Sequence, residues 1–129
     1  MNTTLWIIQS LLAAFFIMAG FGKIRSSKKQ HIADGHIKPE ASIIPIRILG
    51  ILELLGCIGI VIPWLTDVAP ILTPITAVCF CLVMLGALVV HFKKKEYKFL
   101  LLPVVVIVLA LVVAYYRFGQ TLDILTRPL

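Results

Sequence analysis

The chain alternates between long apolar stretches and short polar segments. The stretches span residues 5–22, 43–64, 68–92 and 99–117. Inside them the charged side chains are Arg47, Glu53 and, at the end of the fourth stretch, Arg117. Because a membrane-spanning helix needs about 20 predominantly apolar residues, each stretch is long enough to cross a bilayer. The pattern therefore predicts an all-α protein with four transmembrane helices.

The connections between the stretches are short, so consecutive helices are expected to run antiparallel and to form a four-helix bundle. Residues 1–129 then make a single transmembrane domain with no room for a soluble one. We interpret the first stretch as a retained helix and not as a cleaved signal peptide. The reason is that Met1–Thr4 lacks the basic residues with which a signal peptide begins.

The composition supports a location in a bilayer. Hydrophobic residues make up 60% of the chain, whereas soluble domains are typically about 45–50% apolar. A chain of this size cannot bury so much apolar surface in its own interior. An ordinary soluble enzyme, a disordered tail and a disulfide-stabilised secreted domain are therefore excluded, and the lipid bilayer is the expected partner.

Most of the basic residues lie in two of the polar segments. Short cytoplasmic loops of membrane proteins carry an excess of Lys and Arg, so we expect residues 23–42 and 93–98 to be cytoplasmic and both termini to be non-cytoplasmic. The net charge of +6 then indicates topology and an attraction to anionic lipid headgroups, with no nucleic-acid partner. The basic residues of the two segments are Lys23, Arg25, Lys28, Lys29, Lys38, Lys93, Lys94, Lys95 and Lys98.

The C-terminal tail has a helical pattern of its own. Phe118, Leu122, Leu125 and Leu129 recur at spacings of four, three and four residues, which places them on one helical face. Gly119 is expected to separate this segment from the fourth span. The tail is predicted to be a short helix in the membrane interface, with a frayed tail as the alternative.

Glu53 is the most informative polar residue. It lies ten residues after Ile43 and eleven before Trp64, or roughly 15 Å from either end of its span. An ionisable group near the membrane midplane is costly and is presumed to have a function or a partner. Gly50 and Gly56 flank it on the same face and leave space for another backbone or for a groove. The functional interpretation is a ligand, proton or quinone site, and the alternative is a neutral Glu53 in a structural interhelical hydrogen bond.

Three basic side chains are expected near the cytoplasmic end of this site. Arg47 lies four residues inside the second span, but six positions along a helix turn it away from the face of Glu53. Lys23 ends the first span and His91 ends the third, so the three can form a basic cluster that faces an anionic group. Snorkelling of Lys23 to the headgroups is the alternative, and snorkelling is also the expected behaviour of Arg117.

The sequence predicts no metal site and no covalently bound cofactor. His31 and His36 are five residues apart in a loop without matching ligands nearby. Cys57, Cys79 and Cys81 form no CxxC motif, and their odd number argues against a complete disulfide framework. We expect them to behave as small hydrophobic residues, with a redox pair between Cys57 and Cys79 as the alternative.

The polar residues of the four spans resemble those of the DoxX-like family of small four-helix membrane proteins. The resemblance runs from about Leu11 to Gly119. It rests on an AG-x-x-K exit from the first span, an R-x-x-G-x-x-E-x-x-G run in the second, a GA-x-x-x-H end to the third and the arginine that ends the fourth. These motifs consist of Ala19, Gly20 and Lys23; Arg47, Gly50, Glu53 and Gly56; Gly86, Ala87 and His91; and Arg117.

The resemblance implies a multi-pass protein of the bacterial cytoplasmic (inner) membrane. It associates the chain with quinone-linked oxidation of sulfur compounds, with membrane complexes that handle oxidative stress and, through eukaryotic relatives, with chaperones of ion-channel assembly. We expect a membrane subunit or accessory of a quinone-linked redox system, with a redox protein partner and with a quinone or another small amphipathic ligand near Glu53. The candidate ligand-binding residues are Glu53, Arg47, His91, Lys23, Gly50, Gly56 and Arg117.

Two other functions stay open. The chain can be an assembly factor or chaperone that packs against partner helices through the face of Gly50 and Gly56. It can also be a small transporter or proton pathway through Glu53, which as a homo-oligomer would gain the titratable groups that one copy lacks. As an enzyme it is at most a membrane subunit of an oxidoreductase, because the sequence contains no cofactor-binding domain.

Overall fold

The computed structural model describes residues 2–35 and 37–126, without the side chain of Phe99. Within these ranges the chain is helical and forms no strand. Four helices are long and apolar enough to cross a membrane, so the predicted all-α fold with four spans is confirmed. The helices are α1 (Asn2–Arg25), α2 (Lys28–Ala33), α3 (Ile44–Thr66), α4 (Leu72–Lys93), the 3₁₀ turn η1 (Tyr97–Phe99) and α5 (Leu101–Thr126).

Proline residues mark the beginnings of three of the long helices. Pro45, Pro74 and Pro103 lie within the first three residues of α3, α4 and α5 respectively. At these positions the missing backbone N–H costs no helical hydrogen bond, and the fixed φ angle of proline already suits a helix. The prolines therefore help to define where each span begins.

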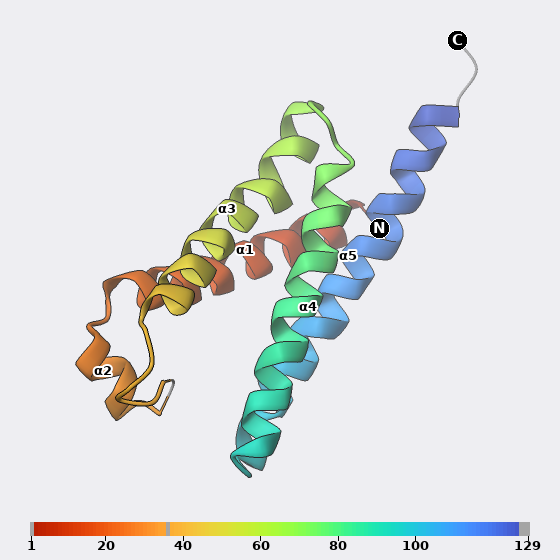
Figure 1. The fold of residues 1–129 in the computed structure, drawn as a ribbon. Helices are drawn as coiled ribbons and strands as arrows, with labels where there is room; N and C mark the ends of the chain where they lie inside the picture. Colours follow the sequence, from red (N-terminus) through yellow and green to blue (C-terminus); the bar gives the residue numbers. More distant parts are fainter. Residues whose placement is uncertain (1, 36, 127–129) are drawn as a thin grey trace.

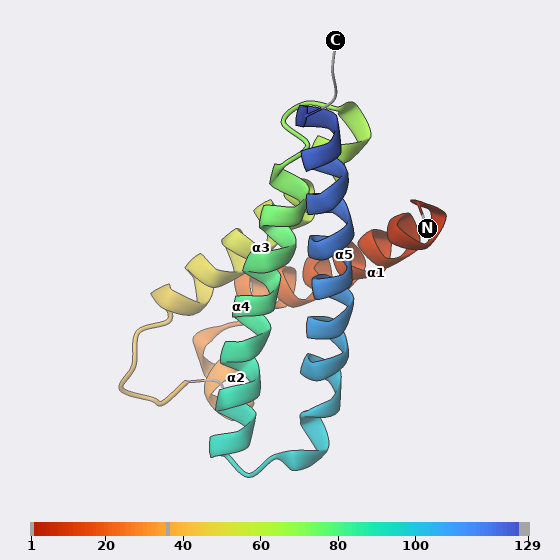
Figure 2. The same ribbon diagram turned by 90° about the vertical axis from the view of Figure 1, so that its right-hand side faces the viewer.

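The long helices pack as two antiparallel pairs. In Figure 1, α1 lies against α3, and α4 lies against α5. The pairs cross each other, and they meet where α3 contacts α4 and where α1 contacts α5 (Figure 2). At this crossing the ring of Phe16 in α1 stacks on that of Phe80 in α4, with centroids 3.8 Å apart. The crossing forms the centre of the buried core.

The outer surface of the helices is apolar. Leu12, Ile60 and Ala110 are buried in the core, whereas Leu52 and Leu82 on the outer faces are 57% and 62% exposed. An exposed apolar surface that surrounds a small core is the arrangement expected of helices in contact with lipid. The protein is therefore a multi-pass integral membrane protein.

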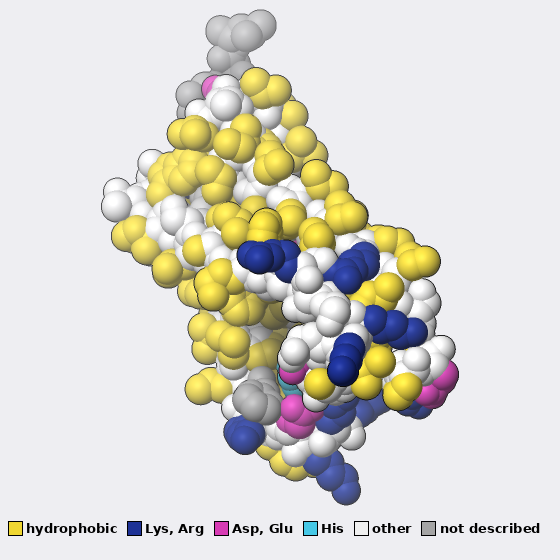
Figure 3. All heavy atoms as spheres, turned by 90° about the vertical axis from the view of Figure 1, so that its left-hand side faces the viewer, with side chains coloured by type: hydrophobic (Ala, Val, Ile, Leu, Met, Phe, Trp, Pro, Cys, Tyr) yellow, Lys and Arg dark blue, Asp and Glu magenta, His cyan; other side chains and the backbone are white. Residues whose placement is uncertain are grey.

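The two basic segments lie at the same end of the molecule. Lys94 donates a hydrogen bond from Nζ to the carbonyl oxygen of Gly35, which joins residues 23–42 to residues 93–98. Figure 3 shows Lys and Arg side chains gathered at this end, with a largely hydrophobic surface beyond them. The charge asymmetry of the sequence is thus an asymmetry of the folded molecule.

The C-terminal segment continues α5 and is not a separate helix. Gly119 does not interrupt α5, which runs without a break to Thr126. A single glycine costs a helix only about 1 kcal/mol relative to alanine, and the neighbouring Arg117 and Thr121 are buried in the bundle. Phe118, Leu122 and Leu125 lie on the exposed side of α5, while Leu129 falls outside the described residues.

Candidate functional site

Two glycines allow α1 and α3 to cross at close range. A Cβ atom added to Gly20 would lie 2.8 Å from the carbonyl oxygen of Gly50, and one added to Gly50 would lie 2.8 Å from that of Gly20. No side chain fits at either position, because the obstacle is backbone. The atom added to Gly50 would also lie 2.9 Å from the Cβ of Lys23. The crossing therefore places Lys23 beside the face of α3 that carries Glu53.

Glu53 is buried and forms an ion pair with Lys23. The residue is 1% exposed, and Lys23 Nζ lies 3.1 Å from each of its carboxylate oxygens and donates a hydrogen bond to Oε2. Burial of a carboxylate is costly unless the group is paired. Lys23 therefore makes Glu53 tolerable at this depth, and the alternative in which Lys23 snorkels to the headgroups is wrong.

Arg47 and His31 close the end of α1 next to the ion pair. Arg47 donates from Nη1 to the carbonyl oxygen of Lys23 at 3.2 Å, and His31 Nε2 lies 3.3 Å from the same oxygen. The last carbonyls of a helix have no partner within the helix. A positive charge there also interacts favourably with the negative end of the helix dipole. Arg47 thus supports the position of Lys23 and does not itself pair with Glu53.

An apolar groove beside Glu53 opens toward the lipid. It lies between α3 and α4 and has a volume of about 350 Å³. Leu52 and Leu55 on its rim are each 57% exposed. The Oε1 atom of Glu53 accepts no hydrogen bond from any described residue, although the ammonium of Lys23 is near it. The groove is lined by Leu49, Leu52, Glu53, Leu55, Gly56, Thr76, Cys79, Phe80 and Val83.

The two glycines that flank Glu53 are covered from within the chain. Gly50 contacts Gly20 and Lys23, and a Cβ atom added to Gly56 would lie 2.5 Å from the ring of Phe80. Their surfaces are therefore used by α1 and α4. Gly56 still contributes to the wall of the groove, whereas Gly50 serves the helix crossing.

His91 lies further along α4 than the groove. It is eight residues beyond Val83, or about 12 Å along the helix axis. Its Nδ1 atom lies 3.8 Å from a carboxylate oxygen of Glu96. The structure brings Lys23, Arg47 and Glu53 together, whereas His91 contacts Glu96 in the segment that follows α4.

Arg117 is fully buried, which corrects the expectation that it snorkels. Its Nε donates to Oε1 of Gln9 at 2.7 Å, and its Nη1 donates to Oδ1 of Asn2 at 2.9 Å and to Oε1 of Gln120 at 2.8 Å. These amide oxygens take the place of the water that snorkelling would have reached. Arg117 thereby links α5 to the first turns of α1.

Two indole rings complete the surroundings of Arg117. Its Cζ atom lies 4.4 Å from the ring centroid of Trp64 and 5.4 Å from that of Trp6. Cation–π contacts of this kind contribute about 0.5–2 kcal/mol each, and more when desolvated. The tryptophans near the ends of two spans are therefore contacts of a buried arginine as well as aromatic residues of the interface.

Gln9 is a buried polar residue that the apolar pattern alone conceals. It is fully buried, and it donates from Nε2 to the carbonyl oxygen of Ile60 at 2.7 Å while accepting from Arg117. It therefore connects α1, α3 and α5. The spacing of Gln9 is the sequence signal that could have indicated its burial, because Leu5, Gln9 and Leu12 fall on one helical face.

The cysteines and histidines form no further site among the described residues. Within residues 2–35 and 37–126, no group of three or more His, Cys, Asp or Glu is placed to hold a metal ion. The three cysteines are free, and Cys57 and Cys81 are buried. Cys57 donates from Sγ to the carbonyl oxygen of Ala13 at 3.3 Å. It therefore acts as a packing residue between α1 and α3.

The fold and the buried charges define a multi-pass, four-helix membrane protein with an ion pair at the crossing of its first two spans. The chain belongs to the DoxX-like family, whose model matches residues 7–113. This segment contains Lys23, Arg47, Glu53 and His91 and ends before Arg117. No curated protein and no solved structure matches the chain.

Proposed function

We propose that the chain is a membrane subunit or accessory of a quinone-linked redox system, and that the groove beside Glu53 binds a quinone or another small amphipathic molecule. One observation carries this proposal: a buried carboxylate lines a lipid-facing apolar groove, and its Oε1 atom accepts no hydrogen bond from the described residues. The chain belongs to the DoxX-like family, and quinone-linked oxidation is one of the roles that the resemblance to this family implies.

The chemistry of the groove fits a hydroxyl-bearing head group. An ionised carboxylate only accepts hydrogen bonds, so Oε1 of Glu53 suits the hydroxyl of a quinol or of a similar amphiphile. Lys23 holds the carboxylate in place from the other side. Phe80 and the exposed leucines of the groove offer apolar contacts for a ring and a tail, and a volume of about 350 Å³ is within the range of small-molecule sites. When bound, a quinone supplies a carrier for two electrons and two protons.

The site is expected to lie in a bacterial cytoplasmic membrane, with the basic end in the cytoplasm. This orientation follows the excess of Lys and Arg in cytoplasmic loops. Both basic segments lie at that end of the molecule, which supports the proposal. A redox protein partner that supplies or removes electrons would then exchange them with a carrier held in the groove.

The proposal is tested by measuring the quinone that purified protein retains. Glu53→Gln removes the ionised acceptor, and Leu52→Trp fills the groove from its lipid-facing rim. Their matched controls are Glu40→Gln, at an exposed carboxylate, and Ile51→Trp, at an exposed residue of α3 outside the groove. We expect wild type and both controls to retain quinone and the two groove variants to lose it. Equal quinone in all five proteins, or none in any of them, would overturn the proposal.

The other two functions have less support. An assembly factor that docks through Gly50 and Gly56 would find Gly50 covered by α1 and Gly56 partly covered by Phe80. A proton pathway needs further titratable groups beyond Glu53. Toward the other end of the bundle, the buried polar side chains of the described residues are Gln9, Thr73, Arg117 and Thr121. Neutral amides and hydroxyls are poor proton carriers, and a guanidinium stays protonated.

A further inference from the structure

We propose that Arg117 is the receptor for an anionic head group, a carboxylate or a phosphate, carried by an acyl-chain molecule. The site lies at the end of the bundle opposite the ion pair of Lys23 and Glu53. It is separate from the groove between α3 and α4, so its test is independent of the proposed quinone site.

The guanidinium of Arg117 is a buried positive charge. Arginine stays protonated in proteins, and Arg117 is 0% exposed. Its hydrogen-bond partners are the neutral amides of Gln9, Asn2 and Gln120. No described carboxylate forms an ion pair with it, and Asp123, the acidic residue of α5, is exposed. A buried charge is usually paired with an opposite one, and none of the carboxylates in residues 2–35 and 37–126 is paired with Arg117.

The two terminal nitrogens of Arg117 have different surroundings. Nη2 is buried and has no hydrogen-bond partner among the described residues. Nη1 is shared by Asn2, which is exposed, and by Gln120, which is half-buried. A carboxylate or a phosphate accepts from both nitrogens at once. An anion that displaces the amide of Gln120 would therefore satisfy Nη2 and neutralise the charge in one step.

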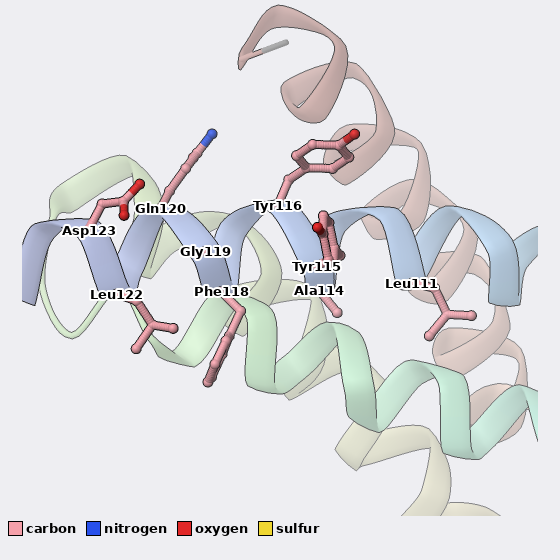
Figure 4. Close-up of a pocket in the computed structure, with 9 residues that line it drawn as sticks. All are labelled: Leu111, Ala114, Tyr115, Tyr116, Phe118, Gly119, Gln120, Leu122 and Asp123. Atoms are coloured by element: carbon pink, nitrogen blue, oxygen red, sulfur yellow. The ribbon is translucent and has the colours of Figure 1, made fainter.

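Gln120 lines an open hollow on the surface of α5. The hollow has a volume of about 640 Å³, and a Cβ atom added to Gly119 would contact nothing within 4 Å. Figure 4 shows Gln120 and Tyr116 on one side of the helix and Leu111, Phe118 and Leu122 on the other. Asp123 lies one turn beyond Gln120, away from Arg117, and repels an anion from that end. Arg117 itself lies on the buried face of α5 and does not line the hollow. Gln120 lines the hollow and also accepts a hydrogen bond from Arg117, so a head group would reach the guanidinium by displacing the side chain of Gln120.

The chain contains its own reporter for this site. Trp6 and Trp64 are its two tryptophans, and both rings contact the guanidinium of Arg117. Bromine atoms quench tryptophan fluorescence on contact. Protein in maltoside micelles is therefore titrated separately with a brominated fatty acid, a brominated phosphatidylglycerol and an uncharged brominated diacylglycerol. We expect saturable quenching by a charged probe at a concentration about tenfold below that of the uncharged probe, the effect of one charge-assisted hydrogen bond.

The three probes separate the sources of the anion. Quenching by the fatty acid identifies a free carboxylate, and quenching by the phospholipid identifies a headgroup phosphate. Quenching at the same concentration by all three probes would overturn the proposal, because contact with the tryptophans would then need no charge.

Variants assign the preference to Arg117. Arg117→Gln is expected to abolish the preference for charged probes, while Arg25→Gln, at an exposed arginine of α1, preserves it. Gln120→Leu removes a neutral competitor for Nη1 and is expected to strengthen anion binding severalfold. If circular dichroism shows that Arg117→Gln does not fold, Gln120→Leu still tests whether Arg117 binds the anion. A preference that survives in folded Arg117→Gln, or that Gln120→Leu leaves unchanged, would mean that Arg117 only joins helices.

Discussion

Lys23 Nζ lies 3.1 Å from both carboxylate oxygens of Glu53, although the residues are 30 positions apart and belong to different membrane-spanning helices. The pair depends on the contact between Gly20 and Gly50, which brings the backbones of α1 and α3 together. A polar interaction of the site is thus positioned by two residues that have no side chain.

Loss of Lys23 is expected to destabilise the protein more than loss of the whole pair. Lys23→Met leaves the carboxylate of Glu53 buried without its partner and should lower the free energy of unfolding by about 2 kcal/mol. The double variant Lys23→Met/Glu53→Leu should recover most of that loss. Unfolding in mixed micelles, followed by circular dichroism, measures both, with the exposed Lys28→Met as control. A double variant less stable than Lys23→Met would contradict this account.

The glycine crossing predicts opposite effects for two nearby substitutions. Gly50→Ala forces a methyl group against the carbonyl oxygen of Gly20 and is expected to cost about 1–3 kcal/mol of stability. Gly22→Ala meets open space and should be neutral or stabilising by up to about 1 kcal/mol. The same unfolding assay compares them. Similar stabilities for the two variants would show that α1 and α3 do not approach as closely as described.

Gln9 is predicted to be a structural residue. Gln9→Met preserves its length but removes the additional hydrogen bond to the carbonyl oxygen of Ile60 and leaves the charged Nε of Arg117 without its partner, which should cost about 2–4 kcal/mol. Gln30→Met makes the same change at an exposed position of α2 and should cost less than about 0.5 kcal/mol. Thermal unfolding of the two variants in parallel provides the measurement. An equal and small loss in both would remove Gln9 from the helix-joining network.

The orientation in the membrane is a prediction of the charge distribution. In a variant without native cysteines, single cysteines at Lys94 and at Asp67 would lie on opposite sides of the bilayer. A membrane-impermeant thiol reagent added to intact cells is expected to label Asp67→Cys, and to label Lys94→Cys only after lysis. The reverse pattern would place the basic loops outside.

The apolar pattern was sufficient to predict the four spans, because an apolar stretch of about 20 residues has few alternatives to a membrane helix. Depth within a span also identified Glu53 as buried. The partner of Glu53 was not predictable in the same way. A crossing between helices depends on where small residues of two different segments coincide, and periodicity within one segment contains no such information.

Arg117 shows a second limit of the sequence. Its place at the end of a span suggests snorkelling. The sequence shows how far along a helix a residue lies, but it does not show whether the side chain faces the lipid or the neighbouring helices. Its spacing from Ala110 and Ala114, which are buried on the same face, is the signal that could have turned it inward. Two of its amide partners, Asn2 and Gln9, come from the far end of the chain, in α1, and only the fold reveals them.

Photolabelling with a quinone that carries a photoreactive tail tests the central claim most directly, because it reports where the molecule binds. Protein in native membranes is labelled with and without excess unmodified quinone, and the modified peptides are mapped by mass spectrometry. We expect competable label on the groove residues between Leu49 and Gly56 and between Thr76 and Val83, with loss of that label in Glu53→Gln. Label spread evenly over lipid-facing residues, or unaffected by competitor, would contradict a quinone site at Glu53.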